Sequence, residues 1–139
     1  MRQTLAWVIG ALFIWAGAVK LLDPASFATA VAGFRLVPRE VNNAVAIFLP
    51  PFEMLCGVAL LATHWRCAGA LGVAVLNIVF IVALAQGMAR GLKFECGCFG
   101  KYDPLAHSPL LAIGRDLLLL GCAVWILQTR SRADSIAPA

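Results

Sequence analysis

The sequence predicts an all-α membrane protein, a four-helix transmembrane bundle with a short interfacial helix between the first two spans. Three observations predict this class. The chain of 139 residues is 62% hydrophobic and 13% charged, whereas soluble domains are about half apolar and a quarter charged. Its mean hydropathy is +0.89. It also contains four apolar runs of about 20 residues, the length that a helix needs to cross a hydrocarbon core. We expect a single integral membrane domain over residues 1–139, with helices at about 4–22, 43–62, 67–89 and 109–128.

The first run, at about residues 4–22, is expected to be a retained span. It follows Met1-Arg2 and contains Ala16-Gly17-Ala18, a pattern that also occurs at the cleavage site of signal peptides. However, Lys20 and Asp23 resemble the polar end of a spanning helix. We therefore expect this segment to stay in the membrane.

A short interfacial helix is predicted between the first and second spans. Asp23 is suited to cap a helix, and Pro24 to occupy its first position. Apolar side chains then recur at three- and four-residue spacing: Phe27, Val31 and Phe34. Such spacing is typical of an amphipathic helix that lies along the membrane surface, and we expect Pro38 to end it.

The second run, at about residues 43–62, carries Pro50-Pro51 near its middle and Glu53 at membrane depth. Two prolines remove two backbone donors and kink a helix. An ionisable group at this depth is costly and is expected to face the bundle interior or a water-filled cavity. Alternatively, Glu53 is a neutral acid that bonds a carbonyl and serves packing only. Cys56 lies one turn further along the same face.

The third and fourth runs, at about 67–89 and 109–128, complete the bundle. A connection of only four residues, at 63–66, makes the second and third spans antiparallel neighbours. The third span opens with Ala68-Gly69-Ala70, and such small residues let helix backbones approach closely. The fourth span carries Arg115-Asp116 about two turns from its start.

The polar connection at residues 90–108 contains Cys96-Gly97-Cys98. Two extended residues span at most about 7 Å, the limit for a disulfide, and Gly97 permits the bend that shortens this distance. The resulting ring would be strained, and strained disulfides are the labile, catalytic kind. Two alternatives stay open. The thiolates could bind a soft metal such as Cu(I), Zn or Hg, or both cysteines could be small buried residues without chemistry.

The topology predicts where the charges gather. With four spans, both chain ends share one side of the membrane, and the connection holding Cys96 and Cys98 lies on the other. Lys20, Glu53 and Arg115 then lie in the half of the bundle beneath those cysteines. We expect Glu53 and Arg115 to form a buried pair that offsets the burial cost of both. A cation near a thiol also favours the reactive thiolate.

Charge also bears on orientation and partners. Basic residues are denser on the side of the chain ends, which favours cytoplasmic termini. Disulfide chemistry favours a location outside the cytoplasm for the cysteine connection. The net charge of +4 is spread along loops and ends and shows no basic patch with interleaved aromatic residues. The sequence therefore predicts a lipid bilayer environment and no nucleic-acid partner.

Several of these segments carry a resemblance to a known family: Lys20-Leu21-Leu22-Asp23-Pro24 followed by Phe27, Leu36-Val37-Pro38, Leu49-Pro50-Pro51-Phe52-Glu53 with Gly57, and Cys96-Gly97-Cys98-Phe99-Gly100. Together they resemble the methylamine-utilisation MauE family, within the DoxX-like membrane proteins. The resemblance implies a four-helix protein of the bacterial inner membrane. Its namesake is implicated in maturing the disulfide-rich subunit of methylamine dehydrogenase, beside a thioredoxin-like partner. A more distant resemblance links the thiol loop to vitamin K epoxide reductase.

Three functional hypotheses follow. In the first, Cys96 and Cys98 act as a thiol–disulfide oxidoreductase on a periplasmic thioredoxin-like protein or a disulfide-rich client. Cys56 or a quinone would relay the electrons, with Glu53, Arg115, Lys20 and Asp23 in support. In the second, the same two cysteines capture a soft metal or a small thiol-reactive solute for transport. In the third, the protein is an assembly factor that only holds a partner in the membrane.

Overall fold

The computed structural model describes residues 1–91 and 108–136, and these form five helices without a strand. The helices are α1 (Arg2–Leu22), α2 (Pro24–Phe34), α3 (Arg39–Leu61), α4 (Arg66–Ala89) and α5 (Pro109–Ile136). Four segments are long and apolar enough to cross a membrane: Arg2–Leu22, Arg39–Leu61, Arg66–Ala89 and Leu110–Thr129. The predicted fold class, four spans with a shorter helix between the first two, is confirmed.

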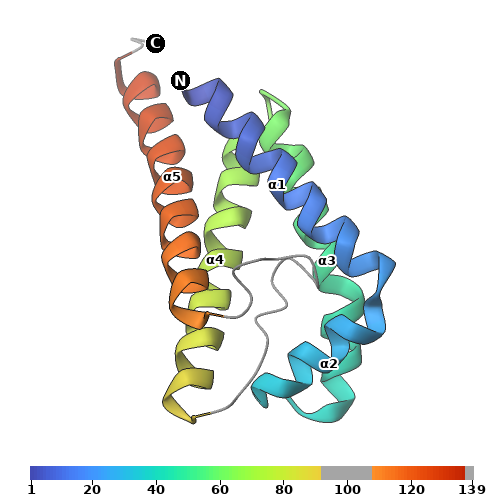
Figure 1. Ribbon diagram of the computed structural model, residues 1–139. Coiled ribbons are helices and arrows are strands. Elements are labelled where there is room, and N and C mark those ends of the chain that lie inside the picture. The colour runs from blue at the N-terminus through green and yellow to red at the C-terminus, as the bar shows by residue number, and fades with distance from the viewer. Residues whose placement is uncertain (92–107, 137–139) are drawn as a thin grey trace.

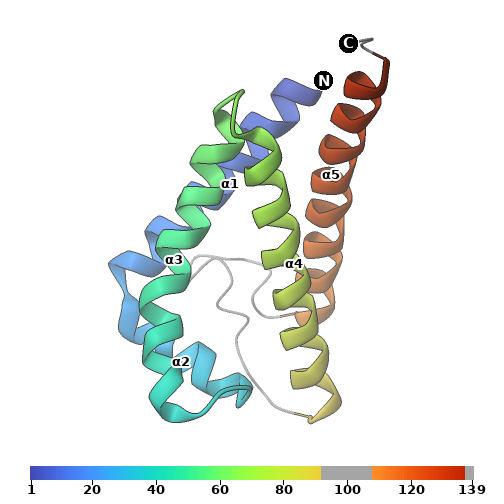
Figure 2. The same cartoon turned by 180° about the vertical axis from the view of Figure 1, so that it is seen from behind.

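The helices pack as two pairs (Figures 1 and 2). The helix α1 lies mainly along α3, and α5 lies mainly along α4, while α3 and α4 contact each other directly. The start of α1 and the end of α5 lie at one end of the bundle, whereas α2 and the C-terminal end of α4 lie at the other (Figure 1). We call the end of the bundle that holds the start of α1 the terminal side, and the opposite end the α2 side.

The start of α2 is set by local chemistry, as predicted. The Asp23 side chain accepts a hydrogen bond of 3.1 Å from the backbone nitrogen of Ser26, and Pro24 occupies the first helical position. An N-cap carboxylate satisfies a backbone donor that has no partner within its helix. The chain therefore leaves α1 and begins α2 across a single residue.

The end of α2 differs from the prediction. The helix stops at Phe34 rather than Pro38, because Arg35 adopts a left-handed conformation with φ 49° and ψ 36°. Its backbone N–H donates to the carbonyl of Ala32, which completes the last turn. Pro38 instead directly precedes α3 and accepts that helix's first backbone bonds. The end of α2 is tied to α4 by Arg90, which donates to the Arg35 carbonyl at 3.2 Å.

The helices α3 and α5 extend beyond their predicted ranges. The first begins at Arg39 rather than near residue 43, and the second reaches Ile136 rather than 128. In α3 the added turn is polar, and Asn42 donates its side-chain amide to the Ala28 carbonyl of α2 at 3.0 Å. The apolar runs thus mark the spans, whereas the helices continue into their polar flanks.

Glycines allow the closest helix contacts. An added Cβ at Gly10 would lie 2.8 Å from the carbonyl oxygen of Gly57, and one at Gly57 would lie 2.7 Å from that of Gly10. Gly17 lies against the Pro50 carbonyl, at 2.7 Å for the same added atom. In α4 an added Cβ at Gly69 would lie 2.5 Å from the backbone nitrogen of Leu60. The predicted close approach at Gly69 is therefore confirmed.

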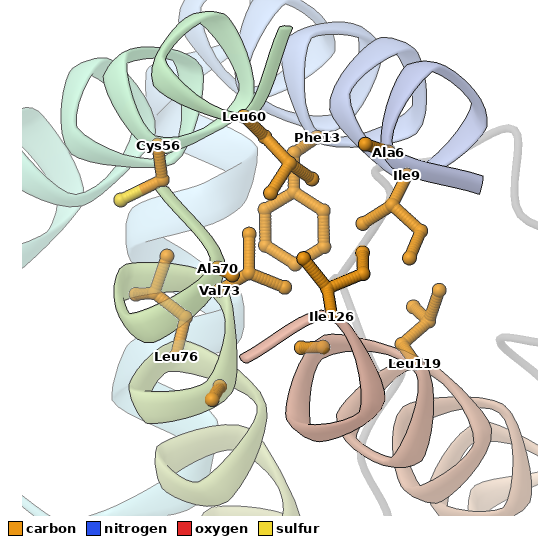
Figure 3. Close-up of a cluster of buried hydrophobic side chains, with 12 residues drawn as sticks. Ala6, Ile9, Phe13, Cys56, Leu60, Ala70, Val73, Leu76, Leu119 and Ile126 are labelled. Carbon is orange, nitrogen blue, oxygen red and sulfur yellow. The ribbon is translucent and has the colours of Figure 1, made fainter. Parts of the chain in front are cut away.

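An apolar core joins the four long helices, and Figure 3 shows its buried side chains. It consists of buried side chains from the four long helices, namely Ala6, Ile9, Phe13, Cys56, Leu60, Ala70, Val73, Ala74, Leu76, Leu119, Ala123 and Ile126. These residues come from the first part of α1 up to Phe13, the end of α3, the first half of α4 and the middle of α5. These side chains fill the space between the four helices. Truncating any of them would leave a void, and close-packed interiors tolerate voids poorly.

Replacing Gly69 by Ala tests the close approach of α3 and α4. The added Cβ would meet backbone atoms of Ala59 and Leu60 within 2.8 Å. Such overpacking is expected to cost about 1–3 kcal/mol. Gly121→Ala is the matched control, because an added Cβ there meets nothing within 4 Å. Thermal unfolding in detergent should show a lower midpoint for G69A and an unchanged or higher one for G121A. Equal midpoints would contradict the packing described here.

Candidate functional site

A buried ion pair joins α1 to α3. The Lys20 ammonium donates to both carboxylate oxygens of Glu53, at 2.7 and 2.8 Å. Each side chain is only 1% exposed. Charged side chains are almost never fully buried unless they are paired, and inside a membrane span an isolated charge is especially costly. Because the ammonium group binds both carboxylate oxygens, each charge compensates the other. Each residue therefore makes the burial of the other possible.

Two aromatic rings complete the surroundings of the Lys20 ammonium. Its nitrogen lies 5.1 Å from the ring centroid of Phe27 and 5.0 Å from that of Phe80. Both distances fall within the range of cation–π attraction, which strengthens when the cation is removed from water. Phe27 belongs to α2 and Phe80 to α4. A single ammonium group therefore contacts three helices besides its own.

The expected pair between Glu53 and Arg115 is wrong. Both oxygens of Glu53 bind Lys20 instead. Arg115 bonds the carboxylate of Asp116, its neighbour on α5, at 3.0 and 3.1 Å. The physical reason is helix order: α1 packs along α3, whereas α5 packs along α4. Asp116 is buried, so α5 carries its own ion pair within the span.

The other supporting residues lie around this pair. Asp23 caps α2, three residues after Lys20. Cys56 is buried one turn from Glu53, with its sulfur against Gly72 of α4. Within the described ranges, Cys56, Cys67 and Cys122 are free thiols.

Cys96 and Cys98 lie outside the described residues, in the segment between α4 and α5. The function predicted for them therefore stays a prediction. In the part of the chain that the structure describes, no group of three or more His, Cys, Asp or Glu side chains could hold a metal ion.

The aromatic partners of Lys20 were not predicted from the sequence. Phe27 was assigned to the apolar face of α2, and Phe80 was not singled out. The sequence contains one signal for Phe27. This residue follows Lys20 by about two helical turns, and the predicted helix break at Asp23-Pro24, where the chain changes direction, lies between them. No local signal identifies Phe80, because its contact depends on how α4 packs against α1 and α2.

Four membrane-length helices with an intramembrane ion pair define a multi-pass helical membrane protein. Sequence comparisons identify the family to which the protein belongs. The family model described as methylamine utilisation protein MauE matches residues 1–129, and the chain belongs to the MauE family. No solved structure matches the chain significantly.

Three curated relatives share the name methylamine utilization protein MauE. The protein from Paracoccus denitrificans is 34% identical over 118 residues, which cover 83% of this chain and 62% of the relative. That from Methylophilus methylotrophus is 30% identical over 118 residues, covering 84% and 62%. That from Paracoccus versutus is 36% identical over 92 residues, covering 66% and 50%. The chain thus matches only half to about three-fifths of the length of these relatives.

Replacing Glu53 by Gln tests the buried pair. The substitution keeps the side-chain shape but leaves the Lys20 charge uncompensated, which is expected to cost about 3–5 kcal/mol. The control is Glu40→Gln, an exposed residue in the first turn of the same helix, for which a change below about 1 kcal/mol is expected. Unfolding midpoints in detergent provide the measurement.

A double variant distinguishes loss of the pair from a general defect at position 53. Lys20→Met combined with Glu53→Gln removes both charges, so it should be more stable than Glu53→Gln alone. A double variant that is less stable than either single variant would mean that the two residues do not act as a pair.

Proposed function

We propose that this protein is a membrane thiol–disulfide oxidoreductase, or the redox partner of one, that acts through Cys96 and Cys98. The observation that carries the proposal is the Cys96-Gly97-Cys98 sequence itself. Two thiols separated by one flexible residue can close a small, reducible ring. The pair lies in the connection that follows α4, whose C-terminal end is on the α2 side of the bundle.

The chemistry is thiol–disulfide exchange. A thiolate of a reduced partner protein attacks one sulfur of the Cys96–Cys98 disulfide and forms a mixed disulfide. The second partner thiolate attacks the partner's own sulfur and releases the membrane protein. Two electrons pass to Cys96 and Cys98, which end as thiols carrying two protons. The partner loses two thiol protons and gains a disulfide. The reverse sequence would reduce the partner.

The biological setting is proposed from the family. The relatives are named for methylamine utilisation, and we place this chain in that process. The partner would be a periplasmic thioredoxin-like protein, or a disulfide-rich client such as a subunit of methylamine dehydrogenase. Electron transfer beyond Cys96 and Cys98 would require a further acceptor such as a quinone.

The proposed orientation places the chain ends in the cytoplasm of a bacterial cell and the cysteine connection in the periplasm. Basic residues lie on both sides, with Arg2 and Arg66 on the terminal side and Arg35, Arg39 and Arg90 on the α2 side. The proposed orientation follows their higher density per residue on the terminal side. Arg66 also donates to the Leu60 carbonyl at 3.3 Å and so helps to end α3. A periplasmic position for the thiols would give them access to an oxidising compartment.

Thiol trapping in whole membranes tests the redox role. After acid quenching, alkylation by a mass tag should show Cys96 and Cys98 in both oxidised and reduced states, and the fractions should change when the partner is added. Cys98→Ser should abolish the disulfide between Cys96 and Cys98 and trap Cys96 in a mixed disulfide with the oxidised partner. Cys122→Ser is the control, because that residue lies on α5 within the bundle.

Two results would contradict the proposal. One is a pair that stays reduced under every oxidant. The other is a double Cys96→Ser/Cys98→Ser variant that retains full function, which would favour a role as an assembly factor.

Stoichiometric Cu, Zn or Hg in the purified protein, lost in Cys98→Ser, would instead favour transport. A membrane-impermeant maleimide that fails to label Cys98 in spheroplasts after the disulfide has been reduced would overturn the orientation.

A further inference from the structure

We propose that Glu53, Phe27 and Phe80 form a binding site for a primary ammonium ion, which the side chain of Lys20 fills. The site combines a carboxylate within 2.8 Å of the ammonium nitrogen with two aromatic rings at 5.0 and 5.1 Å. Aromatic rings beside an anionic group are a recurring way to bind alkylammonium cations. The proposal does not rest on the thiol chemistry of Cys96 and Cys98.

The components of the site come from different helices. Glu53 lies on α3, Phe27 on α2 and Phe80 on α4, so the site is built by folding rather than by one local motif. Glu53 is 1% exposed and Phe27 is 8% exposed. Removal from water strengthens every one of these attractions.

Lys20 supplies the ligand as part of the chain. The end of its side chain is a methylene carbon bearing an ammonium group, the same chemical unit as a small alkylammonium ion. It enters the site from the last turn of α1, directly before the break at Asp23. The structure thus shows the bound position of a primary ammonium, with the linking chain running to α1.

An external ammonium ion must compete with the Lys20 side chain for the site. A tethered group acts at an effective concentration of about millimolar or more. In the wild-type protein, an external alkylammonium ion must exceed that value to displace it. Shortening the side chain to Ala removes the competitor while leaving the carboxylate and both rings. The Lys20→Ala variant should therefore bind methylammonium at lower concentrations than the wild-type protein.

The first experiment measures the cation–π contribution in the native Lys20 background. Phe80 is replaced by phenylalanines carrying one, two and three ring fluorines, which withdraw electron density with little change in size. The unfolding midpoint should fall stepwise along this series. The same series at Phe13, which is buried in the apolar core, is the control and should show no such trend. A flat response at Phe80 would overturn the role of the ring.

The second experiment measures binding directly. The unfolding midpoint of Lys20→Ala is followed as methylammonium chloride is added, with sodium chloride and tetramethylammonium chloride at equal ionic strength as controls. Methylammonium should raise the midpoint by a few degrees beyond either control, because only it can donate hydrogen bonds to Glu53. Lys20→Ala/Glu53→Gln should lose this response. Equal effects of all three salts, or an undiminished response in the double variant, would overturn the proposal. If Lys20→Ala does not accumulate, the fluorine series still tests the Phe80 ring as part of the site, and the absence of a stepwise trend would overturn the proposal.

Discussion

The bond between Lys20 and Glu53 is the constraint on which the arrangement of the bundle depends. Neither charge can be left alone in a region without water, because an unpaired ion there costs several kcal/mol. The pair can form only if the end of α1 lies against the middle of α3. That position in turn brings Phe27 and Phe80 over the ammonium group. One interaction therefore fixes the relative positions of four helices.

The rest of the bundle makes this contact possible. Hydrophobic burial does not drive helices together within lipid, since lipid tails are as apolar as leucine, and close packing takes its place. Gly10, Gly17 and Gly57 bring α1 and α3 to backbone contact. The apolar core near the terminal side then completes the packing of the four long helices. The molecule thus has an apolar layer toward the chain ends and a charged layer toward α2.

The sequence predicted those features that depend on local chemistry or on depth. Apolar runs identified the spans, Asp23-Pro24 identified the start of α2, and the position of Glu53 indicated an inward-facing charge. Its partner was not predicted, because depth alone allowed either Lys20 or Arg115. The choice depends on which helices are neighbours, and the sequence does not specify this through charge. The glycines of α1 and Gly57 carried the relevant signal, since they mark the faces along which α1 and α3 meet.

The order in which the chain is synthesised gives the ion pair a role in membrane insertion. Lys20 enters the bilayer as part of the first helix, 33 residues before its partner exists. Lys20 lies within two residues of the helix end, so its long side chain can reach the headgroup region before Glu53 is synthesised. Glu53 lies in the middle of its helix and its side chain is too short to do the same. Glu53 therefore acquires its buried partner only when the third helix packs beside the first.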